Sequence, residues 1–358
     1  MNETRRVTVG GTAIGDGLPC YVVAEMAWSH DGKLANALRI VEGAAEAGAQ
    51  AINVHVTSLP DYMIRHYGSG KGRVSAGKEG SPVYTYLESI NLSNADWEKV
   101  FARARALQLG LSVMVNDRPS LEFAAAHGPD LLMVPSACMG DLAFITDVAR
   151  RGKPVLISIG GAHLAELERA ILAIRGAGND NVIVQYGFQS YPTQLEDVHL
   201  RYLDTLKRTF GVPVSYGDHT DGADELALTV PVVAVALGAN VIEKHLTYDR
   251  SVKGEDFESA LDIADFRRMM RLIRETEKAL GRTHWNPLNQ REIDYRGVAR
   301  KRAVAARPLA KGETLTEAMV AYKRSDAGLY PDECRPLFGR PLKEALSTDD
   351  PIDWSAVV

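Results

Sequence analysis

Short apolar segments alternate with longer amphipathic segments along most of this chain, and the alternation limits the folds that it can adopt. The apolar segments are rich in valine and isoleucine, which is typical of buried parallel strands. Their ranges are Tyr21–Ala24, Ala51–Val56, Leu111–Val115, Leu131–Pro135, Val155–Ile159, Val182–Tyr186, Val212–Tyr216 and Val241–His245. Between them, apolar residues recur at the 3.6-residue spacing of helices. Such helical ranges include Leu34–Ala47, Asp96–Leu109, Leu164–Ile174, Leu200–Phe210 and Ala264–Leu280.

Eight successive strand–helix units predict a (β/α)8 TIM barrel of the α/β class. An open doubly wound sheet would show the same local pattern, but eight units in about 280 residues are closer to the ~250 residues of a closed barrel. We expect residues 1–19, which precede the first strand, to form a small hairpin at the bottom of the barrel. Left-handed residues often end helices, and the glycines that follow predicted helices are Gly48, Gly110, Gly211 and Gly238.

The pattern changes after Gly281, where helices shorten and strand-like runs alternate with turns. We therefore predict a barrel over residues 1–283, a linker over 284–292 and a small α+β module over 293–358. Within the barrel region, residues 58–91 are long and polar for a connection, and they contain five glycines. This composition predicts a mobile loop over the barrel mouth.

Charge balance and cysteine content exclude several classes of protein. The chain has 41 Lys and Arg against 46 Asp and Glu, a net charge of -5, which argues against a nucleic-acid-binding scaffold. Cys20, Cys138 and Cys334 are far apart and odd in number, so neither a disulfide framework nor a thiolate zinc site is expected. No leader-like segment and no apolar run of about 20 residues is found. We expect a cytoplasmic protein that acts on small molecules, without nucleic-acid or membrane partners.

In a barrel, functional side chains gather at the carboxyl ends of the strands. Polar residues at or just beyond the predicted strand ends include Glu25, His30, Asn53, His55, Ser136, Ser158, Gln189, Tyr191, His219, His245 and Asp256. His219 and His245 follow neighbouring strands, and neutral imidazoles there would bind one divalent metal ion, with a carboxylate such as Glu25 or Asp256 completing the ligand set. Two histidines at the barrel rim that only form hydrogen bonds would show the same spacing, so the spacing leaves both interpretations open. Because Lys244 alternates with His245, we expect it to face the helices and to pair with a carboxylate outside the site.

Several motifs together resemble the sialic acid synthase family. The matching segments are Ala24-Glu25, Ser29 to Gly32, Gln189 to Thr193, Pro213 to Thr220 and Ala236 to Thr247. The tail resembles the antifreeze-like (SAF) module of that family, at Lys311 to Glu313, Lys323-Arg324 and Gly339-Arg340. The resemblance runs in order over nearly the whole chain, but family membership does not fix the substrate.

The resemblance implies a domain-swapped homodimer, in which the SAF module of one chain covers the barrel of the other. It implies a metal-dependent condensation, with manganese or magnesium, of phosphoenolpyruvate with an open-chain amino sugar to give a nonulosonic-type 2-keto-3-deoxy acid. It makes His219 and His245 the metal ligands and gives Glu25 and Asp256 places at the reacting centre. The substrate-binding residues that it implies are Ser136, Ser158, Tyr191 and Arg324. From their positions after strands, we add as candidates His30 for catalysis and Asn53, His55 and Gln189 for substrate binding.

Several strand ends depart from the family pattern. Asn53-Val54-His55 stands where the family has Lys-Phe-Gln, Met133 replaces a second lysine, and Gly217 replaces a serine. A phosphate dianion in a closed pocket needs cations of this kind. The candidate replacements are Arg65, Lys71, Arg73, Lys78 and Arg118.

Three functions therefore remain open. The first is a synthase that uses phosphoenolpyruvate or another small donor. The second is a metal-dependent lyase, aldolase or isomerase on the same scaffold, which the missing lysines favour. The third is an inactive barrel whose SAF module serves binding, and the presence of His219, His245 and Glu25 argues against it.

Overall fold

The computed structural model describes residues 5–66, 82–281 and 287–358 of the chain. The chain divides into two compact units, Met1–Gly281 and Arg282–Val358, and each has its own hydrophobic core. Within the described ranges, no helix combines the length and the apolarity that crossing a membrane requires.

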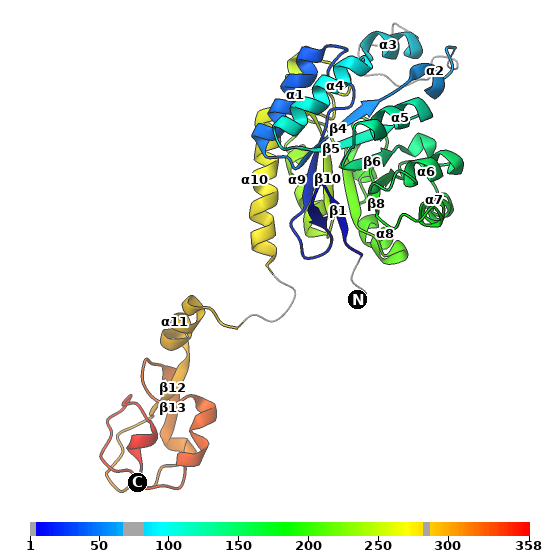
Figure 1. Cartoon of the computed structure of the whole chain (residues 1–358). Coiled ribbons are helices and arrows are strands. Elements are labelled where there is room, and N and C mark those ends of the chain that lie inside the picture. Colours follow the sequence, from blue (N-terminus) through cyan, green and yellow to red (C-terminus); the bar gives the residue numbers. More distant parts are fainter. Residues whose placement is uncertain (1–4, 67–81, 282–286) are drawn as a thin grey trace. The chain divides into compact units, whose positions relative to one another are not determined.

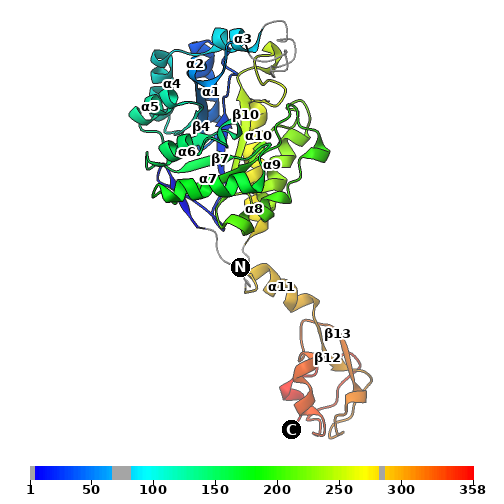
Figure 2. The same ribbon diagram turned by 90° about the vertical axis from the view of Figure 1, so that its right-hand side faces the viewer.

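The first unit is a closed (β/α)8 barrel, which confirms the predicted fold class (Figures 1 and 2). Eight parallel strands pair in chain order, and the last of them, β10, pairs with both β9 and β3, which closes the barrel. The strands are β3 (Tyr21–Glu25), β4 (Ala51–Val56), β5 (Gly110–Val115), β6 (Leu131–Val134), β7 (Val155–Ser158), β8 (Val182–Tyr186), β9 (Val214–Asp218) and β10 (Val241–Thr247). A short strand, β11 (Leu261–Asp262), pairs with the end of β10.

Helices surround the strands (Figure 2). Because all eight strands are parallel, their carboxyl ends meet at one end of the barrel. The helices are α1 (Leu34–Ala47), α2 (Leu59–Tyr62), α3 (Val83–Ile90), α4 (Asn94–Ala106), α5 (Arg118–Ala126), α6 (Leu142–Ala149), α7 (Leu164–Gly176), α8 (Tyr202–Phe210), α9 (Leu226–Ala236) and α10 (Ile263–Leu280). The segment predicted as one long loop thus contains α2 and α3, and residues 67–81 lie outside the described ranges.

The N-terminal hairpin closes the other end of the barrel, as predicted. Strands β1 (Val7–Val9) and β2 (Thr12–Ile14) pair in antiparallel fashion. The side chains of Val7, Val9 and Ile14 are buried in one cluster with Ile183 and Val241 from the barrel strands. Burial of these apolar side chains fixes the bottom of the barrel, and the functional end lies opposite.

Two local predictions were wrong. Strand β9 begins at Val214, two residues later than predicted, because Pro213 has no N–H to donate to a sheet. Gly110 does not end a helix: Gln108 takes the left-handed conformation (φ 59°), and Gly110 begins β5. A Cβ on Gly110 would lie 2.5 Å from the Tyr21 hydroxyl, so glycine is needed there for close approach. The other three predicted left-handed glycines are confirmed.

The second unit is a small α+β module. It contains α11 (Gln290–Ala299) and an antiparallel pair of strands, β12 (Lys301–Ala305) and β13 (Val320–Arg324). Its core is a separate cluster of buried apolar side chains that includes Ala303, Leu315, Leu337 and Ile352.

Candidate active site

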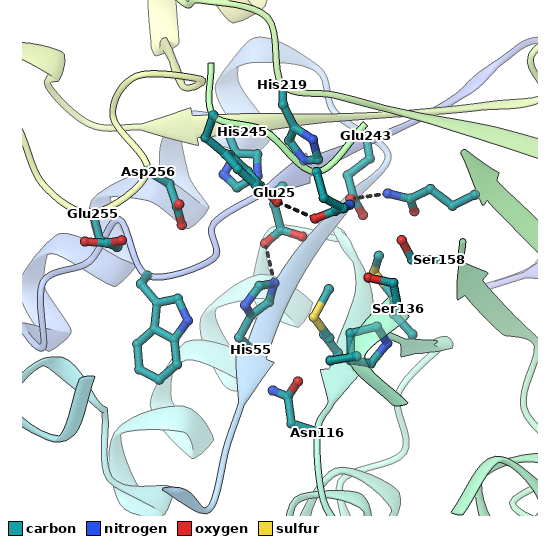
Figure 3. A pocket seen from close by; sticks show the side chains of 18 of the residues that line it. Glu25, His55, Asn116, Ser136, Ser158, His219, Glu243, His245, Glu255 and Asp256 are labelled. Carbon is teal, nitrogen blue, oxygen red and sulfur yellow. Dashed lines mark hydrogen bonds and ion pairs between the residues drawn. The ribbon is translucent and has the colours of Figure 1, made fainter. Parts of the chain in front are cut away.

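A cavity of about 550 Å³ opens at the carboxyl ends of the barrel strands (Figure 3). The predicted site residues that line it are Glu25, His55, Ser136, Ser158, Gln189, Tyr191, His219, His245 and Asp256. Sequence reasoning did not assign a role to several other lining residues, which include Trp28, Met114, Asn116, Gln185, Glu243 and Glu255. The structure therefore brings together most of the predicted site and adds carboxylate and amide groups to it.

His219 and His245 lie beside each other at the ends of β9 and β10, with ring centroids 5.3 Å apart. The Nδ1 of His219 lies 2.8 Å from the carbonyl oxygen of Phe188, and donation there leaves the ring lone pair on Nε2. Burial, and next the nearby His219, hold the pKa of His245 well below its usual range, so this ring is neutral. Its buried Nδ1 has no hydrogen-bond partner among the described residues. Imidazoles in their neutral form have the chemistry of metal ligands.

A divalent metal ion fits these two imidazoles, but the described residues supply no complete ligand set. No group of three or more His, Cys, Asp or Glu side chains in these ranges stands close enough together to hold a metal ion. Glu25, which we expected to complete the set, accepts a 2.5 Å hydrogen bond from the backbone N–H of Ala27 on one oxygen and a hydrogen bond from Asn53 on the other, and its role as a ligand stays a prediction. A metal ion here would take its further ligands from water or substrate oxygens.

Glu25 forms an ion pair with His55 on the neighbouring strand, Oε1 to Nε2 at 3.4 Å (Figure 3). Burial alone would raise the pKa of Glu25, but His55, with smaller contributions from His245 and the Asn53 hydrogen bond, lowers that pKa to about 2. Burial likewise works to lower the pKa of His55, but Glu25 raises it above its ordinary value. Each group therefore favours the charged form of the other, and a protonated His55 can give its proton to a substrate oxygen.

Asn53 is completely buried and lies beneath the pocket rather than in its lining. Its amide nitrogen donates to Glu25 and lies 3.4 Å from the sulfur of Met133, and its oxygen accepts from the Ser112 hydroxyl at 2.7 Å. This position thus holds a neutral side chain whose polar groups form hydrogen bonds inside the barrel, outside the pocket lining where we expected it.

Glu243 is the site residue that sequence reasoning most clearly missed. It lies two residues before His245 and therefore points to the same face of β10, which was the available signal. Its Oε1 accepts a 2.6 Å hydrogen bond from the amide of Gln185, and burial, with Glu25 next, raises its pKa well above the usual range. Glycine at position 217 makes room for this contact, because a Cβ there would lie 2.4 Å from the Gln185 nitrogen.

The two sides of the pocket differ in charge. Glu255 and Asp256, from the loop after β10, lie across the pocket from Ser136 and Ser158, which follow or end β6 and β7 (Figure 3). In the described parts of the chain, no lysine or arginine lines the cavity. Of the cations proposed as replacements, Arg118 pairs with Asp147 and Arg65 lies over the Tyr84 ring. Lys71, Arg73 and Lys78 lie outside the described residues.

Besides Asn53, two predicted residues lie outside the pocket lining. His30 is fully buried outside the pocket, where its ring packs edge-on against Trp97 at 5.4 Å between centroids and its Nδ1 accepts from the N–H of Gly32. Burial, and next His55, lower its pKa to about 3, so its placement gives no support to a catalytic role. Arg324 is exposed at the end of β13 in the second unit.

Comparison with known proteins gives one consistent family. The pattern of the NeuB family matches residues 40–284, and that of the SAF domain matches residues 300–358. An uncharacterised protein of Methanocaldococcus jannaschii is 31% identical, with 98% of each chain covered. The N,N'-diacetyllegionaminic acid synthase of Legionella pneumophila is 27% identical over 100% of this chain and 99% of its own. The crystal structure of the N-acetylneuraminic acid (sialic acid) synthetase of Leptospira borgpetersenii superposes with a TM-score of 0.71, at 26% identity, over 82% of this chain and 97% of that one.

Proposed function

The chain belongs to the NeuB family and carries a C-terminal SAF domain, and on this premise we propose that it is a metal-dependent enzyme that joins a small donor to an open-chain amino sugar or related aldehyde. The product would be a nonulosonic-type 2-keto-3-deoxy acid. The observation that carries the proposal is a set of side chains at the barrel mouth: the adjacent imidazoles of His219 and His245 beside the ion pair of Glu25 and His55. The legionaminic and sialic acid synthases among its relatives support the same reaction type.

Each group has a distinct task in this proposal. A divalent ion on the two imidazoles, manganese or magnesium, would polarise the aldehyde oxygen. With phosphoenolpyruvate as the donor, its C3 would attack the aldehyde carbon, and His55 would protonate the aldehyde oxygen, which becomes a hydroxyl. Water would then add to C2 of the donor, and phosphate would leave to give the 2-keto acid. Glu25 keeps His55 protonated and oriented. The neutral side chains of Ser136 and Ser158 would donate hydrogen bonds to substrate oxygens.

The charge of the pocket favours a second candidate, in which the donor is not phosphoenolpyruvate. Four carboxyl groups line the cavity, and Met133 and the Asn53 beneath it are neutral. Phosphoenolpyruvate is a trianion, and carboxylates in the lining would repel it. The same carboxylates would repel a carbonyl compound with one carboxylate less strongly. The second candidate is therefore a metal-dependent lyase, aldolase or isomerase of the same carbon skeleton.

One assay separates the two candidates. The full chain is loaded with Mn²⁺ and incubated with phosphoenolpyruvate and a panel of N-acyl amino sugars, and phosphate release is followed. Release that requires both metal and sugar supports the synthase. If phosphate is not released but the same sugars with pyruvate give a 2-keto-3-deoxy acid, the second candidate holds. If a metal-loaded protein does neither with any sugar, the proposal of carbon–carbon bond formation fails.

The SAF domain has a separate proposal, in which two chains form a homodimer and Arg324 of each binds the N-acyl group of the sugar in the other chain's site. Complementation tests it, because Glu25→Gln and Arg324→Ala would then damage different halves of one site. Two inactive variants mixed as subunits should regain about a quarter to a half of wild-type activity, since one site in a mixed dimer is intact. A monomer by light scattering, or no recovery on mixing, would contradict the arrangement.

A further inference from the structure

The proposed function uses the pocket-facing residues of β9 and β10 and leaves a buried ion pair behind them unexplained. The ammonium of Lys244 lies 2.6 Å from Oδ2 of Asp218, and both side chains are 0% exposed. The pair lies outside the pocket lining, on the helix side of the strands, as the alternation with His245 predicts.

The hydrogen bonds of the pair are unusually complete for buried charges. Asp218 accepts from the hydroxyl of Tyr216 at 2.9 Å and from that of Thr220 at 2.7 Å. Lys244 also donates to the backbone carbonyl of Thr220 at 3.1 Å. A buried ion pair of this kind often adds no net stability over neutral side chains of similar size, because desolvation of the charges opposes their attraction. Stability alone therefore does not account for its presence.

The positions of the two partners suggest what it does. Lys244 and Asp218 are register partners on adjacent strands, and each is covalently next to one of the two pocket histidines. The ammonium contacts residues on both sides of His219, namely Asp218 and Thr220, while its own backbone continues directly into His245. The side chain of Lys244 thus links the backbone on either side of His219 to the backbone next to His245.

The two histidines depend on this link to different degrees. His219 is also held by its ring contact with Phe188 and by hydrogen bonds to its carbonyl from Thr193 and Ser259. The ring nitrogen Nδ1 of His245 has no such partner among the described residues. We propose that the Lys244–Asp218 pair is a positioning clamp, which holds His245 at the distance from His219 that binding of one divalent ion requires.

This inference rests on the metal site of the proposed function, and Mn²⁺ binding to the full chain tests it without any substrate. In the double variant Lys244→Met with Asp218→Asn, both charges are removed and side-chain volumes are nearly kept. We expect Mn²⁺ affinity, followed by electron paramagnetic resonance, to fall about 10-fold or more, as when groups that orient metal ligands are removed. Tyr216→Phe, which removes one hydrogen bond to Asp218, should weaken Mn²⁺ binding about threefold.

A matched control separates positioning from general damage. Asn179 is buried and bonds to the carbonyls of Ala149 and Lys153, far along the chain from both histidines, so Asn179→Ala should lower the melting temperature and leave Mn²⁺ affinity unchanged. Wild-type affinity in the folded double variant, or an equal loss in Asn179→Ala, overturns the clamp. If the double variant does not fold, Tyr216→Phe decides, and unchanged affinity there overturns it. Retention of Mn²⁺ by His245→Ala instead overturns the proposed metal site, and the clamp with it.

Discussion

The two sides of the barrel mouth are built by different means. On the β9–β10 side, the adjacent imidazoles of His219 and His245 are next in the chain to a buried ion pair with several hydrogen bonds. On the β4–β6 side, Asn53, Met133 and Ser136 are neutral, and the one histidine of β4, His55, is paired with Glu25. The first side is organised for a cation and the second is not organised for a phosphate. Under the proposed function, the β9–β10 side would activate the acceptor, and the β4–β6 side is where we expect donor binding to depart from the family pattern.

The largest expected effect is on the β9–β10 side. His245→Ala should abolish Mn²⁺ binding and lower kcat/KM by at least about 100-fold, because one of two protein ligands is lost. Calorimetric titration with Mn²⁺ and steady-state assays measure both. His127→Gln is the control, since that ring packs on Phe123 of α5, outside the pocket lining, and should change neither quantity. Full metal content in His245→Ala would show that His245 is not a metal ligand, and the β9–β10 side would then not be a metal site as proposed.

Glu25→Gln tests the ion pair that lies between the two sides. We expect kcat/KM to fall about 100-fold, a typical loss for an acid–base group, because His55 loses the carboxylate that keeps it protonated. The pKa of His55, followed by NMR, should drop below its ordinary value, since burial then acts alone. An unchanged His55 pKa would show that Glu25 does not control it.

The Glu25–His55 pair also predicts the pH range in which the wild type is most stabilised relative to Glu25→Gln. Glu25 has its pKa lowered from 4.5 to about 2, so its contribution is complete above about 4.5 and is lost as the pH falls through about 2. The pKa of His55 is raised from 6.5, so its contribution is complete below about 6.5 and is lost as the pH rises through the raised value. The melting temperature of the wild type should therefore exceed that of Glu25→Gln most at about pH 5 to 6. A difference that grows steadily toward alkaline pH would contradict the pair.

Met133→Lys tests the neutral side by giving it a cation. Because Met133 lines the pocket, a lysine there should tighten binding of phosphoenolpyruvate about 10-fold, through one charge-assisted contact with an anionic group. Met133→Leu keeps the site neutral and should leave that affinity unchanged. Equilibrium dialysis with labelled phosphoenolpyruvate measures both variants. If the wild type already binds phosphoenolpyruvate as tightly as Met133→Lys, the neutral β4–β6 side does not weaken binding of this donor, and that part of the comparison is wrong.

The sequence allowed the barrel to be predicted, because strand and helix periods are local and eight repeats leave few alternatives. The ends of the strands then located most of the pocket. The sequence did not reveal how neighbouring polar groups pair with one another. Glu25 pairs with Asn53 and His55, and His30 turns toward Trp97 although it follows the same strand. Such choices depend on contacts between residues that are distant in the chain, and no period in the sequence encodes them.

The smallest expected effect comes from Gly217→Ser, which restores the residue type of the family pattern. Its Cβ would displace the Gln185 amide, and the buried Glu243 would lose its 2.6 Å hydrogen bond. We expect about 1–2 kcal/mol lower stability in urea, with Mn²⁺ affinity nearly unchanged because neither imidazole is touched. A double-mutant cycle with Gln185→Ala isolates the cause. Once the amide is gone, Gly217→Ser should cost almost nothing, and a full cost in that background would show that the glycine is needed for the backbone itself.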